Sequence, residues 1–464
     1  MQALQALLQF SLGERLMNSA VRQVSDSAGK RFVSIGAVLD RTNGIGQGFD
    51  TLRIILSIAI LCWHSIVTSY GREAELPFWT NPLTGGIVTS LLPIFFALSG
   101  FLVMGSAVRT KSLKVFLAAR GLRILPALAT EVTISAVILG SLVTSLSLSE
   151  YFANAGFFQY FGSLIGKIQI SLPGVFTTNP LDNQVNGSLW TIAPEILCYT
   201  YIAFVIATGL LEKRRVLSIL IVSMTAFLVV CDIFELGLRK IGDPFLPHIL
   251  ILAFALGNLL FLWRNAVPFS RSLFVGCLVV GMALVSHPKL ATLATPPLVY
   301  VTVYLGLLPL PRIPLLDRGD YSYGIYLYAM PVQQSFVFAF PQLRQWYWNI
   351  LFALPVTTAL AMASWSFIEK PALRLRKRLG TPPARAANPP ARPATGPARV
   401  ASPAMIAAIL TYGLWLSSTQ YAIPLASAHR KWVLAAVLLS VIAALVFGRL
   451  GSRPYGQPGP RTTP

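Results

Sequence analysis

The chain has 464 residues, of which 55% are hydrophobic and only 12% charged, and its mean hydropathy is +0.65. A water-soluble core cannot bury so much apolar surface, so the composition excludes an ordinary soluble protein and predicts an all-α, polytopic transmembrane helical bundle. The net charge of +20 is carried by short Lys and Arg clusters between apolar runs, a pattern that sets membrane orientation and argues against nucleic-acid binding.

Residues 1–48 contain no long apolar run followed by a small-residue cleavage site, so no cleaved signal peptide is expected. Apolar residues recur there at helical spacing with Arg and Lys between them. This pattern predicts a cytoplasmic extension with an amphipathic helix on the membrane surface, and disorder is the alternative.

A helix needs about 20 apolar residues to cross the hydrocarbon core. On that criterion a transmembrane domain covers 49–378, and its longest outer loop, about 148–187, has the length of a lid, an acceptor-binding loop or a spacer. The domain is predicted to hold about ten spans, near residues 52–69, 84–107, 124–147, 188–211, 216–234, 247–263, 272–286, 296–310, 321–339 and 347–367.

Residues 379–402 are rich in Pro, Ala and Arg, which predicts an extended basic linker. Two further apolar runs, near 403–424 and 432–449, predict a transmembrane hairpin within 403–450, and the polar tail 451–464 is expected to be disordered. Alternate loops hold most of the Lys and Arg. The positive-inside rule therefore predicts a multi-pass protein of the inner (plasma) membrane with both termini in the cytoplasm.

The first predicted span contains an ionisable side chain, His64. Arg53 precedes it by eleven residues, about three turns or roughly 16 Å along a helix, so the two lie on one face at different depths. An ionisable group inside a span is costly to insert and so predicts a functional site. A buried histidine bonded to a backbone carbonyl of a neighbouring helix is the alternative.

Two further stretches carry charge into the predicted membrane region. Arg120 and Arg123 share one helix face, and paired guanidinium groups suit a phosphate-bearing ligand, unless they are only positive-inside anchors. Glu195 lies about two turns into a span from the other side, after an interfacial Trp190. A carboxylate at that depth needs a partner, and His64 on a facing helix is the expected one. A structural pairing of Glu195 with a lysine or a backbone amide is the alternative.

The span at 321–339 presents hydroxyls and amides that suit either a sugar or helix packing, among them Tyr323, Tyr326 and Gln333. The pair Ser99-Gly100 permits close approach of two helix backbones. The four cysteines lie in or beside apolar runs without metal-ligand spacing, so they predict neither a disulfide nor a metal site.

Together these stretches resemble the acyltransferase 3 family of integral membrane proteins, which O-acylate surface polysaccharides, peptidoglycan, lipopolysaccharide and related glycans. The chain departs from many relatives at Ile196, where they have a second glutamate, and at Ala329, where they have a histidine. The resemblance runs from about Phe49 to Arg378 and rests on Arg53 with His64, F-F-x-L-S-G-F-L at Phe95 to Leu102, R-x-x-R-I-x-P-A-L at Arg120 to Leu128, G-S-L-W-T at Gly187 to Thr191, S-Y-G-I-Y-L at Ser322 to Leu327, and I-E-K-P-A at Ile368 to Ala372.

The resemblance implies a transferase that moves an acyl group, with acetyl expected, from cytoplasmic acyl-CoA to a hydroxyl of a glycan or lipid-linked sugar at the outer side. No permanently bound cofactor is expected. His64 would either act as the general base for the acceptor hydroxyl or shuttle the acyl group, and Glu195 would orient it and stabilise its charged form. Arg53 is assigned to the catalytic set with them, in contact with either the donor phosphates or the inner end of the same channel. Arg120 and Arg123 would hold the donor phosphates. The residues assigned to the acceptor are Trp190, Tyr323, Tyr326 and Gln333.

The alternative function is a proton-coupled transporter or flippase of a lipid-linked sugar, in which His64 and Glu195 form a proton relay. Such a transporter commonly shows a twofold internal repeat with broken helices at matching positions, and the sequence contains neither pattern.

Overall fold

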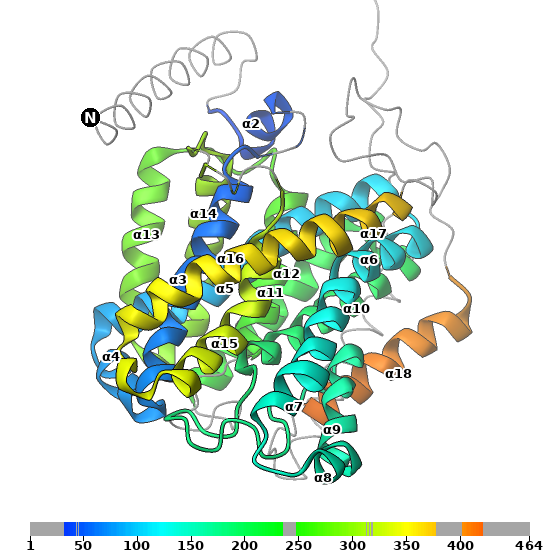
Figure 1. Ribbon diagram of the computed structural model, residues 1–464. Coiled ribbons are helices and arrows are strands. Elements are labelled where there is room, and N and C mark those ends of the chain that lie inside the picture. Colours follow the sequence, from blue (N-terminus) through cyan, green and yellow to red (C-terminus); the bar gives the residue numbers. More distant parts are fainter. Residues whose placement is uncertain are drawn as a thin grey trace, which may run out of the picture.

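The computed structural model describes residues 32–42, 44, 46–234, 247–311, 313, 314, 316, 319–376 and 401–420. Within these residues the protein is a helical bundle without β-strands, which confirms the all-α prediction (Figure 1). We call the end of the bundle where α3 (Phe49–Tyr70) begins the Arg53 end. The opposite end, at the foot of Figure 1, carries the long connection between residues 144 and 186, and we call it the loop end.

Six of the described helical segments are long and apolar enough to cross a membrane, and each coincides with a predicted span. They are α3, α5 (Pro82–Thr110), the run α6 (Leu113–Thr133), η2 (Ile134–Leu139) and α7 (Gly140–Val143), the run η4 (Gly187–Thr191) and α10 (Ile192–Ala207), α11 (Arg214–Ile233), and the run α16 (Trp346–Ser364), η8 (Trp365–Glu369) and α17 (Lys370–Arg374).

The other four predicted core spans are also helices, but they are not among those six. They are α12 (Pro247–Leu262), α13 (Arg271–Val285), α14 (Ala291–Leu307) and α15 (Ser322–Ala339). Short helical turns occupy several connections: η1 (Arg72–Glu75), α4 (Leu76–Thr80), α8 (Leu148–Ala153), α9 (Ala155–Tyr160), η3 (Phe161–Ile165), η5 (Leu210–Glu212), η6 (Pro288–Leu290) and η7 (Pro341–Leu343).

The helices α5 and α12 cross with their backbones in close contact. A Cβ atom added at Gly100 would lie 2.1 Å from the carbonyl oxygen of Phe254, and one at Gly257 would lie 2.4 Å from that of Ala97. Only glycine fits at either position, because any larger residue would push the helices apart. The close approach predicted from the Ser-Gly pair is therefore present.

The helix α6 begins at Leu113, eleven residues before the predicted span near 124–147. Arg120 and Arg123 lie within the helix, and a hydropathy scale scores each arginine as unfavourable for membrane insertion. Arg123 can occupy this position because two carboxylates neutralise its charge, one in the connection before α15 and one in η8, as the site geometry below shows.

The long connection at the loop end is fastened to α15 by the side chain of Gln334. Asn179 Nδ2 donates to the carbonyl oxygen of Gln334 at 2.9 Å and to its Oε1 at 3.0 Å. Gln334 Nε2 in turn donates to the carbonyls of Leu181 and Gln184 at 2.8 and 2.7 Å. These bonds hold part of the loop against the membrane domain beside His64.

Two helices lie outside the predicted transmembrane domain. Near the N-terminus, α2 (Ile35–Arg41) docks on the α12–α13 connection, with Ile35 N donating to the carbonyl of Val267 at 3.0 Å. The predicted amphipathic helix upstream lies outside the described residues. Near the C-terminus, α18 (Pro403–Gln420) packs on α10 (Figure 1), and Tyr412 Oη donates to the carbonyl of Ile165 at 3.0 Å. This helix corresponds to the first half of the predicted hairpin. Most of the predicted linker, the second apolar run and the tail are outside the described residues.

Candidate active site

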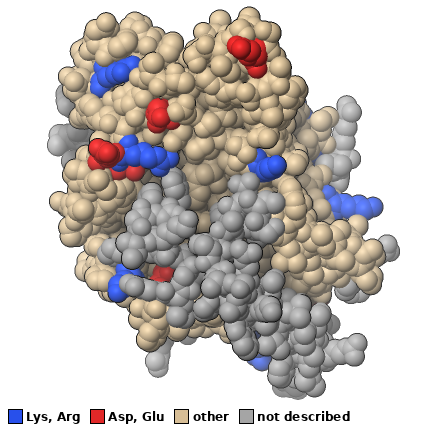
Figure 2. Space-filling model, turned by 90° about the horizontal axis from the view of Figure 1, so that it is seen from below, with Lys and Arg blue, Asp and Glu red and all other residues tan. Residues whose placement is uncertain are grey.

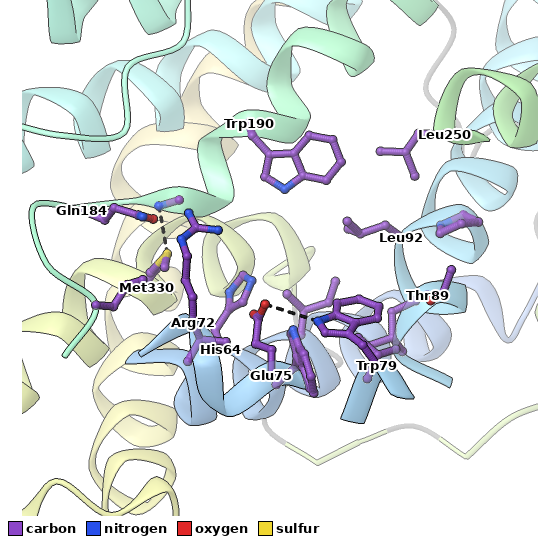
Figure 3. A pocket seen from close by; sticks show the side chains of 18 of the residues that line it. His64, Arg72, Glu75, Trp79, Thr89, Leu92, Gln184, Trp190, Leu250 and Met330 are labelled. Atoms are coloured by element: carbon purple, nitrogen blue, oxygen red, sulfur yellow. Dashed lines mark hydrogen bonds between the residues drawn. The ribbon is translucent and has the colours of Figure 1, made fainter. Parts of the chain in front are cut away.

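His64 lines a cleft that opens toward the loop end, which we call the histidine cleft. The cleft holds about 930 Å³ of space outside protein atoms, part of it open to solvent. Its wall combines apolar side chains with three tryptophans, Trp63, Trp79 and Trp190. In Figure 3 the His64 imidazole lies between the side chains of Arg72 and Glu75, and Trp190 lies across the cleft from Glu75.

A second cleft of about 800 Å³ lies nearer the Arg53 end, and we call it the arginine cleft. Arginines from two helices line it together with one carboxylate and several hydroxyls. The polar residues that matter below are Arg53, Arg120, Arg123, Glu195, Tyr323 and Tyr326. The cluster of cations favours an anionic ligand in this cleft.

The two clefts adjoin inside the bundle. Leu92 of α5 lines both of them. In η4 the consecutive residues Trp190 and Thr191 line the histidine cleft and the arginine cleft respectively. A ligand in one cleft is therefore separated from a ligand in the other by little more than the Leu92 side chain and one turn of η4.

The imidazole of His64 is held through its Nδ1 atom. Ser188 Oγ of η4 lies 3.4 Å from Nδ1. The other ring nitrogen, Nε2, makes no hydrogen bond to any residue in the described part of the chain. When Nδ1 carries the ring proton, Ser188 Oγ accepts a hydrogen bond from it, and the Nε2 lone pair is free to act as a base in the cleft.

Ser188 is itself positioned by a buried polar chain that the sequence reasoning missed. Asn186 Oδ1 accepts from the backbone N–H of Ser188 at 3.2 Å, and Asn186 Nδ2 donates to Glu131 Oε1 at 2.8 Å. Glu131 is 1% exposed within α6 and also accepts from Ser135 Oγ at 2.9 Å. An ionisable group in an apolar span was the signal that singled out His64, and the same signal marks Glu131.

The expected pairing of Glu195 with His64 is wrong. Glu195 Oε1 accepts from Tyr199 Oη at 2.7 Å, and Glu195 lines the arginine cleft rather than the histidine cleft. Ser188 is the residue level with His64, and Glu195 follows it by seven positions, roughly 10 Å further along a helix. Glu195 therefore lies among the arginines, and the sequence had placed it too close to the imidazole.

Arg123 is engaged by carboxylates that the sequence reasoning did not assign. Its guanidinium donates to Asp320 Oδ2 at 2.7 Å and to Glu369 Oε2 at 2.8 Å. Asp320 Oδ2 also lies 3.5 Å from Arg53 Nη1. Because both arms of the Arg123 fork are occupied, the residue ties α6 to the start of α15 and to η8, and it is poorly suited to hold donor phosphates as predicted.

Arg120, unlike Arg123, is held by aromatic rings rather than by carboxylates. Its guanidinium lies over the rings of Phe116 and Tyr199, at 5.9 and 5.8 Å from the ring centroids. It forms no ion pair with a carboxylate in the described part of the chain, and its Nε atom is buried without a hydrogen-bond partner there. Arg120 therefore retains donors for an anionic ligand in the arginine cleft.

The four predicted acceptor residues lie in three different places. Trp190 lines the histidine cleft, whereas Tyr323 and Tyr326 line the arginine cleft. Tyr326 Oη is bonded to Thr191 Oγ1 at 2.7 Å and to the carbonyl of Ser188 at 3.0 Å. Gln333 lines neither cleft. It is fully buried, and its Nε2 donates to the carbonyl of Leu61 at 2.8 Å, so its predicted acceptor contact is wrong. A buried amide bonds to the nearest backbone carbonyl rather than leave its donors unsatisfied.

The fold and the two clefts define an integral membrane protein with a histidine in one cleft and clustered arginines in the adjoining one, inside one helical bundle. The chain belongs to the Acyl_transf_3 family, whose model, described as an acyltransferase domain, matches residues 47–366. The resemblance found from the sequence is thus confirmed, and the protein is a membrane O-acyltransferase.

Two curated relatives match over most of their length. An "O-acetyl transferase" of Shigella phage Sf6 is 27% identical over 330 residues, which cover 69% of this chain and 94% of the relative. "Nodulation protein 10" of Rhizobium leguminosarum bv. viciae is 27% identical over 385 residues, covering 74% of this chain and 98% of the relative. No solved structure matches the chain.

Proposed function

We propose that the protein transfers an acyl group, acetyl in the first instance, from acyl-CoA in the arginine cleft to a sugar hydroxyl in the histidine cleft. The observation that carries this proposal is the adjacency of the two clefts at Leu92. The acetyl group is suggested by the printed name of the phage relative, and the hydroxyl acceptor by the O-acyl chemistry of the family.

The donor would bind through its phosphates. Arg120 retains free donors, and among the described residues Arg53 meets one carboxylate at long range, Asp320 at 3.5 Å. Charge-assisted bonds from these two guanidinium groups would hold the phosphates near the Arg53 end, with the acyl thioester directed toward Leu92. Arg123 would support the site by keeping α6 and α15 in place.

In the transfer step, His64 Nε2 takes the proton from the acceptor hydroxyl, and the hydroxyl oxygen attacks the thioester carbonyl carbon. The carbon–sulfur bond breaks, and the departing thiolate takes the proton from the imidazolium. The products are an ester and free CoA thiol, and the imidazole is restored. An imidazole can both accept and donate a proton at its ring nitrogen, which suits both proton transfers, and Ser188 would keep the ring in the required tautomer.

The proposal also assigns the two sides of the membrane. With the Arg53 end in the cytoplasm of an inner-membrane protein, acyl-CoA reaches the arginine cleft directly and the glycan reaches the histidine cleft from outside. Basic residues gather in the connections at the Arg53 end, such as Lys213 to Arg215. On the loop-end face, Lys and Arg are few and scattered in the part that is not grey (Figure 2), and this difference supports the assignment.

The test is turnover of radiolabelled acetyl-CoA by the purified protein, with release of CoA thiol measured alongside transfer of the label to water or sugar hydroxyls. We expect turnover by the wild type and none by His64→Ala. His287→Ala is the matched control, because His287 is exposed and lines neither cleft. Equal turnover by the wild type and His64→Ala, or no turnover by the wild type, would contradict the proposal.

A further inference from the structure

The histidine cleft has a second set of polar and aromatic groups beside His64, supplied by the short segment that follows α3. Arg72 and Glu75 belong to η1, and Trp79 belongs to α4. All three line the cleft, and none belongs to the sequence motifs of the catalytic domain. The segment therefore brings one cation, one carboxylate and one indole to the mouth of the site.

The aromatic groups form a rigid wall. The Trp63 ring packs edge to face against Trp79 and against Phe78, with 5.5 Å between centroids in each pair. Such pairs fix ring orientation, and an indole offers a broad apolar face at little entropic cost. Trp190 lies on the other side of the cleft (Figure 3), so aromatic surface borders the cleft on two sides.

One carboxylate oxygen of Glu75 accepts a hydrogen bond within the described residues, and the other does not. Its Oε2 accepts from Trp79 Nε1 at 3.3 Å, whereas Oε1 makes no hydrogen bond to another described residue. Partial burial raises the pKa of the Glu75 carboxyl, and a hydrogen bond from Trp79 opposes that effect. A further donor from a ligand would favour the ionised form in the same way.

This set of groups selects among ligand classes. A polyanion would meet the Glu75 carboxylate, and an alkyl chain would remove Glu75 Oε1 and His64 Nε2 from water without offering either a hydrogen bond. A sugar ring suits both the aromatic wall and the polar groups of the cleft. Its C–H face packs on an indole, and its hydroxyls bond to carboxylate, guanidinium and amide groups. Gln184 from the long loop supplies the amide.

We propose that the histidine cleft binds one pyranose ring of the acceptor, packed on the Trp79 indole, with Glu75 and Arg72 bonded to hydroxyls neighbouring the one that meets His64. This inference rests on the proposed function for the identity of the reacting hydroxyl. Because Arg72 and Glu75 flank His64 (Figure 3), they determine which hydroxyl of the ring is acylated. The segment η1–α4 is thus the element that sets acceptor specificity.

The test is saturation-transfer-difference NMR on the full-length protein in detergent, without an acyl donor, using a panel of methyl pyranosides (gluco, galacto, manno and rhamno) at millimolar concentration. We expect transfer to the ring C–H protons of at least one member. Trp79→Ala should abolish the signal, and Trp79→Phe should keep it because the aromatic face remains. Trp348→Ala is the control, since Trp348 is 42% exposed and lines neither cleft.

Glu75→Gln should weaken binding of the same pyranoside about tenfold, the effect of one lost charge-assisted hydrogen bond. No signal with any pyranoside, or unchanged binding in both Trp79→Ala and Glu75→Gln, would overturn the inference. If Trp79→Ala does not fold, unchanged binding in Glu75→Gln alone overturns it. Acetyl-CoA turnover measured on the same preparation separates the two proposals, because sugar binding without turnover contradicts the proposed function and leaves this inference standing.

Discussion

Ser188 Oγ lies 3.4 Å from His64 Nδ1, although the two residues are 124 positions apart in the chain. This contact joins η4 to α3 and leaves the second imidazole nitrogen facing the histidine cleft. A base whose ring orientation and tautomer are fixed in advance loses less free energy on reaching the transition state.

Ser188→Ala should lower kcat about tenfold with little change in the KM for the acceptor, because the lost hydrogen bond positions the base and does not bind substrate. Ser188→Thr keeps the hydroxyl and should restore most of the rate. Steady-state acetyl transfer by the purified protein measures both. Ser141→Ala is the control, since Ser141 Oγ bonds to the carbonyls of Val137 and Ile138 in its own helical run and lines neither cleft. A Ser188→Ala enzyme with unchanged kcat would remove Ser188 from the mechanism.

His64→Gly should lose about 100-fold or more of the transfer rate, the usual contribution of a general base. Because the substitution leaves a space beside Ser188, added imidazole should restore part of the rate in a concentration-dependent manner. The measurement is the transfer rate against imidazole concentration in His64→Gly and in His64→Phe, which fills the space. Equal stimulation of both variants would mean that imidazole acts in solution rather than in the cleft.

Gly100→Ala should destabilise the bundle by about 1–3 kcal/mol or more, because its Cβ would lie 2.1 Å from the carbonyl oxygen of Phe254. Thermal unfolding in detergent, followed by size-exclusion chromatography, reports the loss. Gly276→Ala is the matched control, since a Cβ there meets nothing within 4 Å. A Gly100→Ala protein as stable as Gly276→Ala would show that α5 and α12 separate without cost.

Much of the fold was predictable because membrane helices must satisfy their own backbone and so produce long apolar runs. The same rule singled out His64, and Trp190, which was assigned to the acceptor, lines the same cleft. The pairing of Arg123 was missed because hydropathy treats this residue as an unpaired charge. Its partners Asp320 and Glu369 lie 197 and 246 residues further along the chain, and no local pattern relates them.

The positions of Glu195 and Gln333 show why the sequence did not predict the hydrogen-bond partners of these residues. Both were identified correctly as polar groups inside helices, but depth along a helix does not say which neighbour a side chain meets. Glu195 bonds to Tyr199 on its own helix, and Gln333 bonds to the backbone of α3. Their partners depend on how the helices pack, and only the three-dimensional arrangement gives that.

The membrane orientation can be tested with single cysteines in a variant that lacks the four native ones. Arg215→Cys should resist an impermeant maleimide in intact cells and Lys167→Cys should react, because the basic connection is expected in the cytoplasm. Both positions are exposed in the structure, so burial does not explain a difference. Both should react after permeabilisation, and labelling of Arg215→Cys from outside would reverse the assignment.

Arg123→Ala should lose stability and Arg120→Ala should lose donor affinity, although the two residues are neighbours on one helix face. Removal of Arg123 leaves Glu369, which is 1% exposed, without its ion pair. Loss of one partner of a buried pair costs about 3–5 kcal/mol, so Arg123→Ala should unfold at lower temperature and accumulate poorly. Adding Glu369→Gln should recover part of that stability, because it removes the uncompensated charge.

Arg120 has no such ion pair in the described part of the chain, so Arg120→Ala should fold normally and bind donor more weakly. A lost charge-assisted bond to phosphate costs about 1.5–3 kcal/mol, or roughly 10- to 150-fold in the Kd for acetyl-CoA. Arg120→Lys should recover only part of the affinity, because an ammonium keeps the charge but not the planar fork. Thermal stability and acetyl-CoA binding measured on the same preparations separate the two roles. If Arg120→Ala binds acetyl-CoA as tightly as the wild type, the phosphates are held elsewhere, and Arg53 becomes the residue to test next.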